Sequence, residues 1–293
     1  MNRSSLSHNA AIGGPELALR ETVADKKTQD EVEQRSSPRG EIVYRAIHKE
    51  GDDELQRSTS ALAWSGLAAG LSMGFSVLAQ ALLHAGLADT SWRPLVVSFG
   101  YSVGFLIVIL GRQQLFTENT LTVILPLLQR RDGKTLRNVL RLWATVLLAN
   151  LAGGLLFALA MARTAAIDDG VHQAVVKIAE GSMAGGFATI LLRGVFAGWL
   201  IALMVWLLPF AEAARVWVIV IITYVVGLAG FSHIIVGSTE AMFLMLGGYM
   251  SGIDCVTRFI VPALLGNCIG GVALVAAINH AQVVAGSDGG VDV

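Results

Sequence analysis

Long apolar stretches separated by short polar segments dominate the chain from residue 58 onward. A transmembrane helix needs about 20 predominantly apolar residues. Six stretches reach that length, over residues 60–83, 95–128, 142–161, 187–208, 216–250 and 259–278. The pattern therefore predicts an all-α membrane protein with six transmembrane helices in a transport domain of residues 58–280. A polar tail, residues 1–57, precedes this domain, and a short tail, residues 281–293, follows it.

Two of the six stretches, 95–128 and 216–250, are too long for one straight crossing even with tilt. Each is interrupted by polar, turn-prone residues, Gly111-Arg112-Gln113-Gln114 in the first and Gly230-Phe231-Ser232-His233 in the second. Irregular backbone at membrane depth is tolerated only inside protein or beside a water-filled cavity. Spans two and five are therefore predicted to be broken, each into two half-helices joined by a short loop within the membrane.

The two halves of the chain resemble each other. Spans three and six share an Asn-x-x-Gly-Gly motif, at Asn150–Gly154 and at Asn267–Gly271, 117 positions apart. The same interval aligns Phe116 in the first break with His233 in the second. Spans one and four share a glycine pair at a different offset, Gly70/Gly74 and Gly194/Gly198. Because each half has three spans, the second enters from the opposite side, which is an inverted 3+3 repeat. Transporters built in this way place their sites at broken helices near the midplane.

Composition and loop charge set the class and the orientation. The chain is 54% hydrophobic and 15% charged, which excludes an ordinary soluble domain, and its net charge of −1 gives no indication of nucleic-acid binding. The connection 129–141 carries five basic residues and one acid, so it is predicted to face the cytoplasm. Both termini then also lie in the cytoplasm of a bacterium, and the mixed-charge connection 163–186 is expected to be a solvated outer loop.

The N-terminal tail divides by composition. Up to about residue 40 it is polar and charge-rich, which is typical of disorder. Over residues 41–55, Ile42, Val43, Ala46 and Ile47 recur at helical spacing, so a short surface helix that packs loosely is expected there.

His233 is the most informative single residue, because only Tyr224, Glu240 and Tyr249 share its apolar run as ionisable side chains. Ionisable residues inside a membrane are costly and are usually functional. Imidazole has an unperturbed pKa near 6.5, close to physiological pH. We expect His233 to be neutral in the empty pathway and to donate a hydrogen bond or a proton to a passing anion. The alternative is a structural histidine that bonds a carbonyl at the break.

The remaining candidates surround this histidine. Thr117 is expected either to face His233 across the pathway or to cap a half-helix. Glu118 and Glu240 each follow a threonine at an expected half-helix start, where a carboxylate complements the helix dipole. The alternative for both glutamates is a part in the transport chemistry. Dry constrictions are expected from Leu115, Phe116, Phe75 and Leu203. Arg193 either extends outward from the fourth span or supplies a positive field to the pathway.

Four segments give the chain a resemblance to a known family. They are Leu115-Phe116-Thr117, Gly230-Phe231-Ser232-His233, Met204-Val205-Trp206 and Gly266-Asn267-x-Ile269-Gly270-Gly271. Over residues 58–280 the chain resembles the formate/nitrite transporter family, in particular a poorly characterised inner-membrane branch with a long N-terminal tail. The resemblance implies an aquaporin-like protomer in a homopentamer, with one pore per protomer. It also implies passage of small monovalent anions such as formate or nitrite, often with a proton.

The chain departs from the family at three positions. Gly198 stands where the resemblance implies an asparagine facing the pore. Ser182 stands where it implies a lysine near the outer mouth, with Lys177 nearby but out of register, and Arg193 has no counterpart. A second hypothesis therefore stays open, a non-transporting membrane scaffold or sensor whose tail binds a partner. Enzyme signatures such as His-Glu-x-x-His and Gly-x-Ser-x-Gly are absent from the spans, so neither an enzyme nor a cofactor or metal site is expected.

Overall fold

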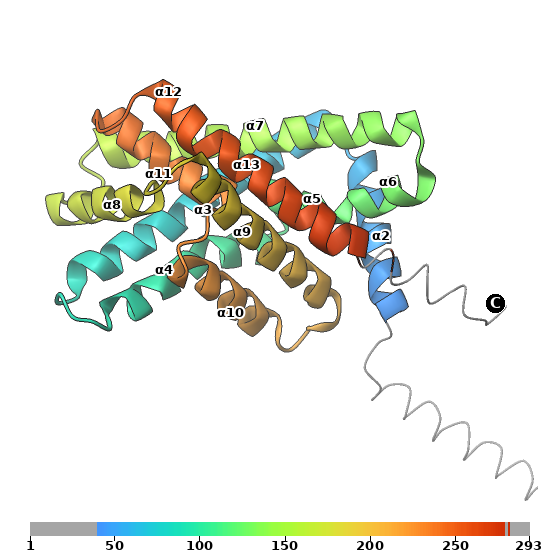
Figure 1. The fold of residues 1–293 in the computed structure, drawn as a ribbon, viewed down its shortest axis with the longest axis horizontal. Coiled ribbons are helices and arrows are strands. Elements are labelled where there is room, and N and C mark those ends of the chain that lie inside the picture. Colours follow the sequence, from blue (N-terminus) through green and yellow to red (C-terminus); the bar gives the residue numbers. More distant parts are fainter. Residues whose placement is uncertain (1–39, 279–280, 282–293) are drawn as a thin grey trace, which may run out of the picture. The chain divides into compact units, whose positions relative to one another are not determined.

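The computed structural model describes residues 40–278 and residue 281, so the predictions for the tail before residue 40 and for residues 282–293 lie outside it. Every described element is helical (Figure 1). In chain order the elements are α2 (Gly40–Gln56), α3 (Thr59–Gly86), α4 (Arg93–Leu110), α5 (Phe116–Thr122), α6 (Ile124–Arg130), α7 (Gly133–Arg163), α8 (Asp169–Ser182), α9 (Phe187–Leu207), η1 (Leu208–Phe210), α10 (Arg215–Leu228), α11 (Ile234–Gly247), α12 (Gly252–Asp254), η2 (Cys255–Ile260), α13 (Val261–Cys268) and η3 (Ile269–Ala277).

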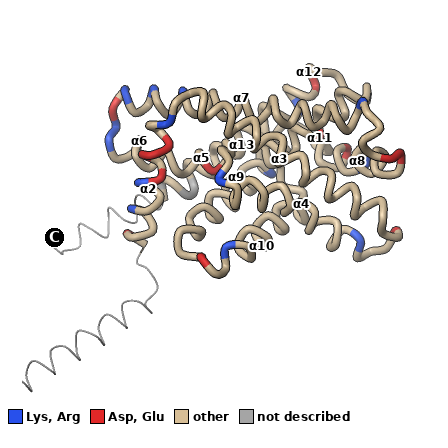
Figure 2. The backbone as a smooth tube through the Cα atoms, turned by 180° about the vertical axis from the view of Figure 1, so that it is seen from behind, with Lys and Arg blue, Asp and Glu red and all other residues tan. Residues whose placement is uncertain are grey.

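In the described part of the chain, five helices are long and apolar enough to cross a membrane: α3, α4, α7, α9 with η1, and the segment Gly252–Ala273. The shorter apolar helices α10 and α11 make up the remaining predicted span. Charged residues gather toward the ends of the long helices, whose middles carry few (Figure 2). Helices α2 and α8 lie at opposite ends of this bundle in both views (Figures 1 and 2).

Both long stretches are broken, as the sequence predicts. The first leaves helical geometry over residues 111–115, between α4 and α5, and the second over residues 229–233, between α10 and α11. Both breaks contain a residue with left-handed backbone: Gly230 has a φ of +63°, which costs glycine little, and Arg112 has a φ of +52° at the other break.

Equivalent glycines bring the helices of each half into close contact. A Cβ built on Gly70 of α3 would collide with the carbonyl of Asn150, and one on Gly198 of α9 would collide with the carbonyl of Asn267. Small residues allow such close backbone approach between membrane helices. Gly70 is therefore the counterpart of Gly198, and the sequence alignment of Gly70 with Gly194 is wrong.

Helix α2 packs more tightly than a loosely attached surface helix would. Its Ile47 is fully buried, and Gly51 sits so close to the Thr122 carbonyl that no side chain would fit. The guanidinium of Arg141, on α7, donates to the carbonyls of Leu55 at 3.0 Å and Arg57 at 3.1 Å. These contacts hold α2 against α5 of the first broken span and against α7.

Helix α8 corrects the expectation of a solvated loop over residues 163–186. Its N-terminus is capped by Asp168, whose carboxylate accepts a hydrogen bond from the Val171 amide at 2.8 Å. Apolar Val171, Ala174, Val175 and Ala179 recur at helical spacing and are buried. The polar residues between them occupy the exposed face, which is why the segment has a mixed composition although half of it is packed.

Candidate transport pathway

Two asparagines brace the two breaks in the same way. The side-chain oxygen of Asn150 accepts from the Phe116 amide at 2.9 Å, and its NH₂ group donates to the carbonyls of Gly66 at 2.7 Å and Gln114 at 2.9 Å. The equivalent oxygen of Asn267 accepts from the Ile234 amide at 2.9 Å, and its NH₂ group donates to Gly194 at 2.9 Å and Ser232 at 2.8 Å. Both asparagines are fully buried. Backbone groups freed by the breaks thus find partners without water.

This symmetry corrects the register of the repeat by one residue. Phe116 and Ile234 begin the half-helices α5 and α11, so their N-caps, Leu115 and His233, are equivalent. The alignment of Phe116 with His233 is wrong. The Asn-x-x-Gly-Gly motif marks both bracing asparagines in the sequence. Their hydrogen-bond partners could not be predicted from it.

The centre of the site is a hydrogen bond between the two broken spans. His233 Nε2 lies 2.8 Å from Thr117 Oγ1, and both residues are almost completely buried, at 1% and 0% exposure. His233 Nδ1 accepts from the Val236 amide at 3.4 Å, so this ring nitrogen carries a lone pair. The proton of the neutral ring is then on Nε2, which donates to the Thr117 hydroxyl.

Apolar side chains pack around this pair. The ring of Phe105 meets the imidazole edge-on, with centroids 4.9 Å apart. Leu115 is fully buried, and Phe116 packs edge-on against Trp143 with centroids 5.7 Å apart. A dry constriction of this kind disfavours a hydrated ion.

Two cavities approach the constriction from opposite ends of the bundle. The larger, of about 660 Å³, lies between α2, the first break and the connection from α9 to α10. Its lining contains five acids, Glu50, Asp53, Glu54, Glu118 and Glu212, and four bases, Lys49, Arg57, Arg112 and Arg215. The smaller, of about 40 Å³, is lined by His233 itself together with residues of α3, α4, α8 and α11.

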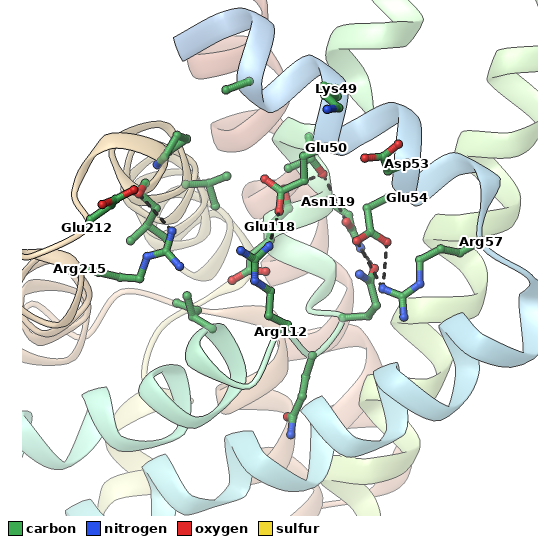
Figure 3. A pocket seen from close by; sticks show the side chains of 18 residues that line it. Lys49, Glu50, Asp53, Glu54, Arg57, Arg112, Glu118, Asn119, Glu212 and Arg215 are labelled. Carbon is green, nitrogen blue, oxygen red and sulfur yellow. Dashed lines mark hydrogen bonds and ion pairs between the residues drawn. The ribbon is translucent and has the colours of Figure 1, made fainter. Parts of the chain in front are cut away.

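We call the larger cavity the α2 vestibule. Figure 3 shows Glu50 of α2 facing Arg112 of the first break and Glu118 of α5, and the Arg112 Nη1 lies 3.7 Å from the Glu50 Oε1. Burial raises the pKa of the Glu54 carboxyl above its ordinary value, while the nearby Arg57 opposes the rise. The vestibule is thus polar and of mixed charge, in contrast to the constriction beyond it.

Several predicted pathway residues lie elsewhere. Phe75 is 43% exposed and shares a stripe of α3 with the exposed Trp64, Leu71 and Leu82, because these positions recur at helical spacing. Leu203 is partly buried on the face of α9 that carries the exposed Trp199. Neither lines the two cavities.

Gly198 and the predicted electrostatic residues also stay outside the site. Gly198 serves helix packing against Asn267, so it opens no space in the pathway. The Arg193 guanidinium donates to the Ala184 carbonyl at 2.8 Å, and Lys177 is exposed on α8. This hydrogen bond supports the interpretation in which the Arg193 side chain extends outward from the fourth span, because Ala184 lies just before α9.

The two glutamates differ in position. Glu118 lies in the first turn of α5, as expected, and lines the α2 vestibule. Glu240 is the seventh residue of α11, because that helix already begins at Ile234. A capping role for Glu240 is therefore wrong. No group of three or more His, Cys, Asp or Glu side chains suited to a metal ion occurs within residues 40–278.

A multi-pass helical protein whose two broken spans meet at a buried polar pair has the architecture of a membrane channel or transporter. Comparison with solved structures supports the fold. An "FNT family ion channel" superposes with a TM-score of 0.70 at 18% identity, over 82% of this chain and 98% of that one. A "Pentameric formate channel with formate bound" gives a TM-score of 0.63 at 19% identity, over 80% and 98%.

The family model described as "Formate/nitrite transporter" matches residues 41–281. "Inner membrane protein YfdC" of Escherichia coli (strain K12) is 38% identical over 251 residues, which are 86% of this chain and 81% of that protein. "Formate channel BtFdhC" of Bacillus thuringiensis is 25% identical over 214 residues, 70% and 79% of the two chains. The chain belongs to the formate/nitrite transporter family, whose members are transporters and channels rather than enzymes. The predicted all-helical, aquaporin-like fold is confirmed.

Proposed function

We propose that this protein conducts small monovalent anions of weak acids, such as formate or nitrite, across a bacterial inner membrane, with a proton exchanged at His233. The observation that carries this proposal is the 2.8 Å hydrogen bond between Thr117 and His233 at the meeting point of the two broken spans. Two relatives whose names include formate, one a channel of 25% identity and one a pentameric structure, support the choice of anion.

The geometry suggests how an anion would be handled. An approaching anion takes the place of the Thr117 oxygen as acceptor of the His233 Nε2 proton, and the freed hydroxyl donates a second hydrogen bond. The N-terminus of α11, which begins directly after His233, adds a partial positive charge. Transfer of the proton to the anion then removes most of the cost of carrying a charge through the apolar constriction.

The assembly and the orientation are part of the same proposal. The apolar stripe of α3 with Trp64, Leu71 and Phe75 is exposed in the single chain, and we infer that it faces lipid or a neighbouring protomer of a homopentamer. The basic residues around the start of α7 favour a cytoplasmic position for that end of the bundle. The α2 vestibule then opens toward the cytoplasm, where both termini also lie.

Flux into proteoliposomes tests the proposal. Purified protein should pass formate or nitrite faster than empty vesicles, and His233→Ala should change the rate or the pH dependence of that flux. Thr117→Val keeps the shape of the side chain but removes the hydroxyl, so it should have an effect in the same direction. His84→Ala, in the last turn of α3, is the matched control and should behave as the parent. An assembled protein that passes no small anion would contradict the proposal and favour the scaffold or sensor.

A further inference from the structure

The smaller cavity contains polar side chains that have no partner. Gln80 of α3 and Ser232 of the second break line it and are only 6% and 4% exposed. The Gln80 Oε1 and the Ser232 Oγ form no hydrogen bond, and the NH₂ group of Gln80 has no partner within the described residues either. Buried polar side chains are nearly always hydrogen-bonded. Two unsatisfied side chains at one cavity therefore indicate that it has an occupant.

Glu240 reaches the same cavity from further along α11. It lies two turns after His233 on the same face of the helix, about 10 Å by the helical rise. Side chains of a helix lean toward its N-terminus, so the Glu240 carboxyl extends back over Val236 and Gly237, which also line the cavity. The carboxyl forms a hydrogen bond with the Ser182 hydroxyl at the end of α8.

Glu240 is uncharged in this setting. The residue is 3% exposed and forms no ion pair within the part of the chain that the structure describes. An isolated carboxylate is so costly in a dry environment that the group keeps its proton instead. One oxygen of the neutral carboxyl accepts from Ser182, and the O–H is left to donate. A buried carboxylic acid of this kind is a hydrogen-bond donor.

The groups around Glu240 give the cavity no counter-charge. The titratable groups that face this region are Tyr101 of α4, His172 of α8, Cys255 of η2 and His233. The charged side chains that α8, η2 and the C-terminal end of α7 carry are exposed instead: Arg163, Asp169, Lys177, Glu180 and Arg258. An occupant of the cavity is therefore held by hydrogen bonds rather than by an ion pair.

The size and the donors of the cavity limit the occupant. A volume of about 40 Å³ is little more than the roughly 30 Å³ that a water molecule occupies in the liquid. An occupant of about three heavy atoms fits with small side-chain adjustments, whereas a larger metabolite does not. Gln80, Ser232 and Glu240 each offer a donor, and an anion with two oxygen atoms accepts from several donors at once. The first turn of α11 borders the cavity and adds the positive end of that helix.

We propose that this cavity is a second anion-binding site of the pathway, for a small monovalent anion with two oxygen atoms such as formate or nitrite, in which the uncharged Glu240 carboxyl donates a hydrogen bond. The Ser232 hydroxyl and the Gln80 NH₂ group donate to the same anion. The site holds the anion on the α8 side of the constriction, beside His233. The inference rests on the proposed anion transport and adds to it a binding site and its donors.

Ser232→Ala and Ser238→Ala form a matched pair of tests. Both serines are buried and their hydroxyls have no partner, but of the two only Ser232 lines the cavity. Formate uptake into proteoliposomes is measured over a range of formate concentrations. Ser232→Ala should raise the concentration for half-maximal flux at least about tenfold, which is the typical worth of a hydrogen bond to a charged group. Ser238→Ala should leave that concentration within about twofold of the parent.

Two substitutions of Glu240 separate hydrogen-bond donation from other roles of the carboxyl. Glu240→Leu removes the donor and should raise the half-maximal formate concentration at least about tenfold. Glu240→Gln keeps an uncharged donor of similar size, so it should recover most of the affinity, to within about threefold of the parent. Equal losses in both variants would overturn the inference, because the amide would then fail to replace the carboxylic acid as donor. Assembly of each variant is checked by size-exclusion chromatography.

Infrared difference spectra on addition of formate observe the protonated carboxyl directly. The parent protein at neutral pH should show the band of a protonated carboxyl that shifts when formate binds, and Glu240→Gln should remove this band. Absence of the band in the parent would overturn the inference, as would equal half-maximal concentrations for Ser232→Ala and Ser238→Ala. These results would leave transport past His233 standing. A parent protein that passes neither formate nor nitrite would instead refute the proposed function.

Discussion

Removal of the Asn267 side chain should destabilise the protein and alter transport, whereas removal of its counterpart Asn150 should mainly destabilise. In Asn267→Ala, the Ile234 amide and the Ser232 carbonyl lose their partner in a fully buried environment. The Gly194 carbonyl lies inside α9 and retains its helical hydrogen bond. Two orphaned groups at about 1–3 kcal/mol each give a loss of roughly 2–6 kcal/mol. Total stabilities are typically about 5–15 kcal/mol, so the effect is large.

The two asparagines form a matched pair of perturbations. Asn150→Ala orphans the Phe116 amide and the Gln114 carbonyl, so the estimated loss is the same. Only Asn267 braces the break that carries His233, because Ser232 and Ile234 flank that residue. The pH dependence of formate flux should therefore change in Asn267→Ala more than in Asn150→Ala.

Reversible unfolding in mixed micelles measures the loss of stability, and hydrogen exchange at the Ile234 and Phe116 amides measures its local part. Exchange should accelerate at the amide whose brace is removed and stay unchanged at the other. Losses below about 1 kcal/mol in both variants would show that the freed groups find other partners, and the bracing argument would then fail. Identical pH profiles in both variants would refute the link between the brace and His233.

Two further predictions concern the packing and the vestibule. Gly198→Ala and Gly70→Ala should each lower the free energy of unfolding by about 1–3 kcal/mol, because a Cβ would collide with an asparagine carbonyl. Gly86→Ala is the control, since the space around Gly86 is open. Equal thermal stability of all three variants would contradict the packing argument. Burial raises the pKa of Glu54, so the neutral carboxyl favours the docked state of α2. The contribution of Glu54 to the stability of the docked helix is fully present below the ordinary carboxyl pKa. It is lost as pH rises through the raised pKa. Amides of α2 should exchange faster at about pH 8 than at about pH 5 after correction for intrinsic rates, and Glu54→Gln should abolish that difference.

The spans and their breaks could be predicted because a dry environment restricts the chain so strongly. Every backbone polar group in a membrane has to be satisfied internally, so apolar runs of sufficient length become helices, and polar interruptions within them mark breaks. His233 and Thr117 could be paired from their places at the two breaks and from the resemblance to a family. Their roles in transport stay a prediction.

Other features depend on which face of a helix meets which neighbour, and composition does not determine that. Phe75 and Gly198 are apolar residues of long spans like many others, and only the packed structure places one on the outside and the other against Asn267. The one-residue error at Phe116 arose because the breaks and the Asn-x-x-Gly-Gly motifs do not repeat at one constant interval. Helix α8 was missed because its apolar residues cover only one face.

The two halves each complete the other across the centre of the molecule. Gly154 of α7 lies against Thr239 of α11, and Gly271 of η3 lies against Thr120 of α5. Residues 120 and 271 are 151 positions apart in the chain. At about 5–20 residues per second, a ribosome needs roughly 8–30 seconds to make that stretch. Throughout that time α5 is already synthesised but lacks the surface of η3 that will cover Thr120, so this contact between the halves can form only late in synthesis.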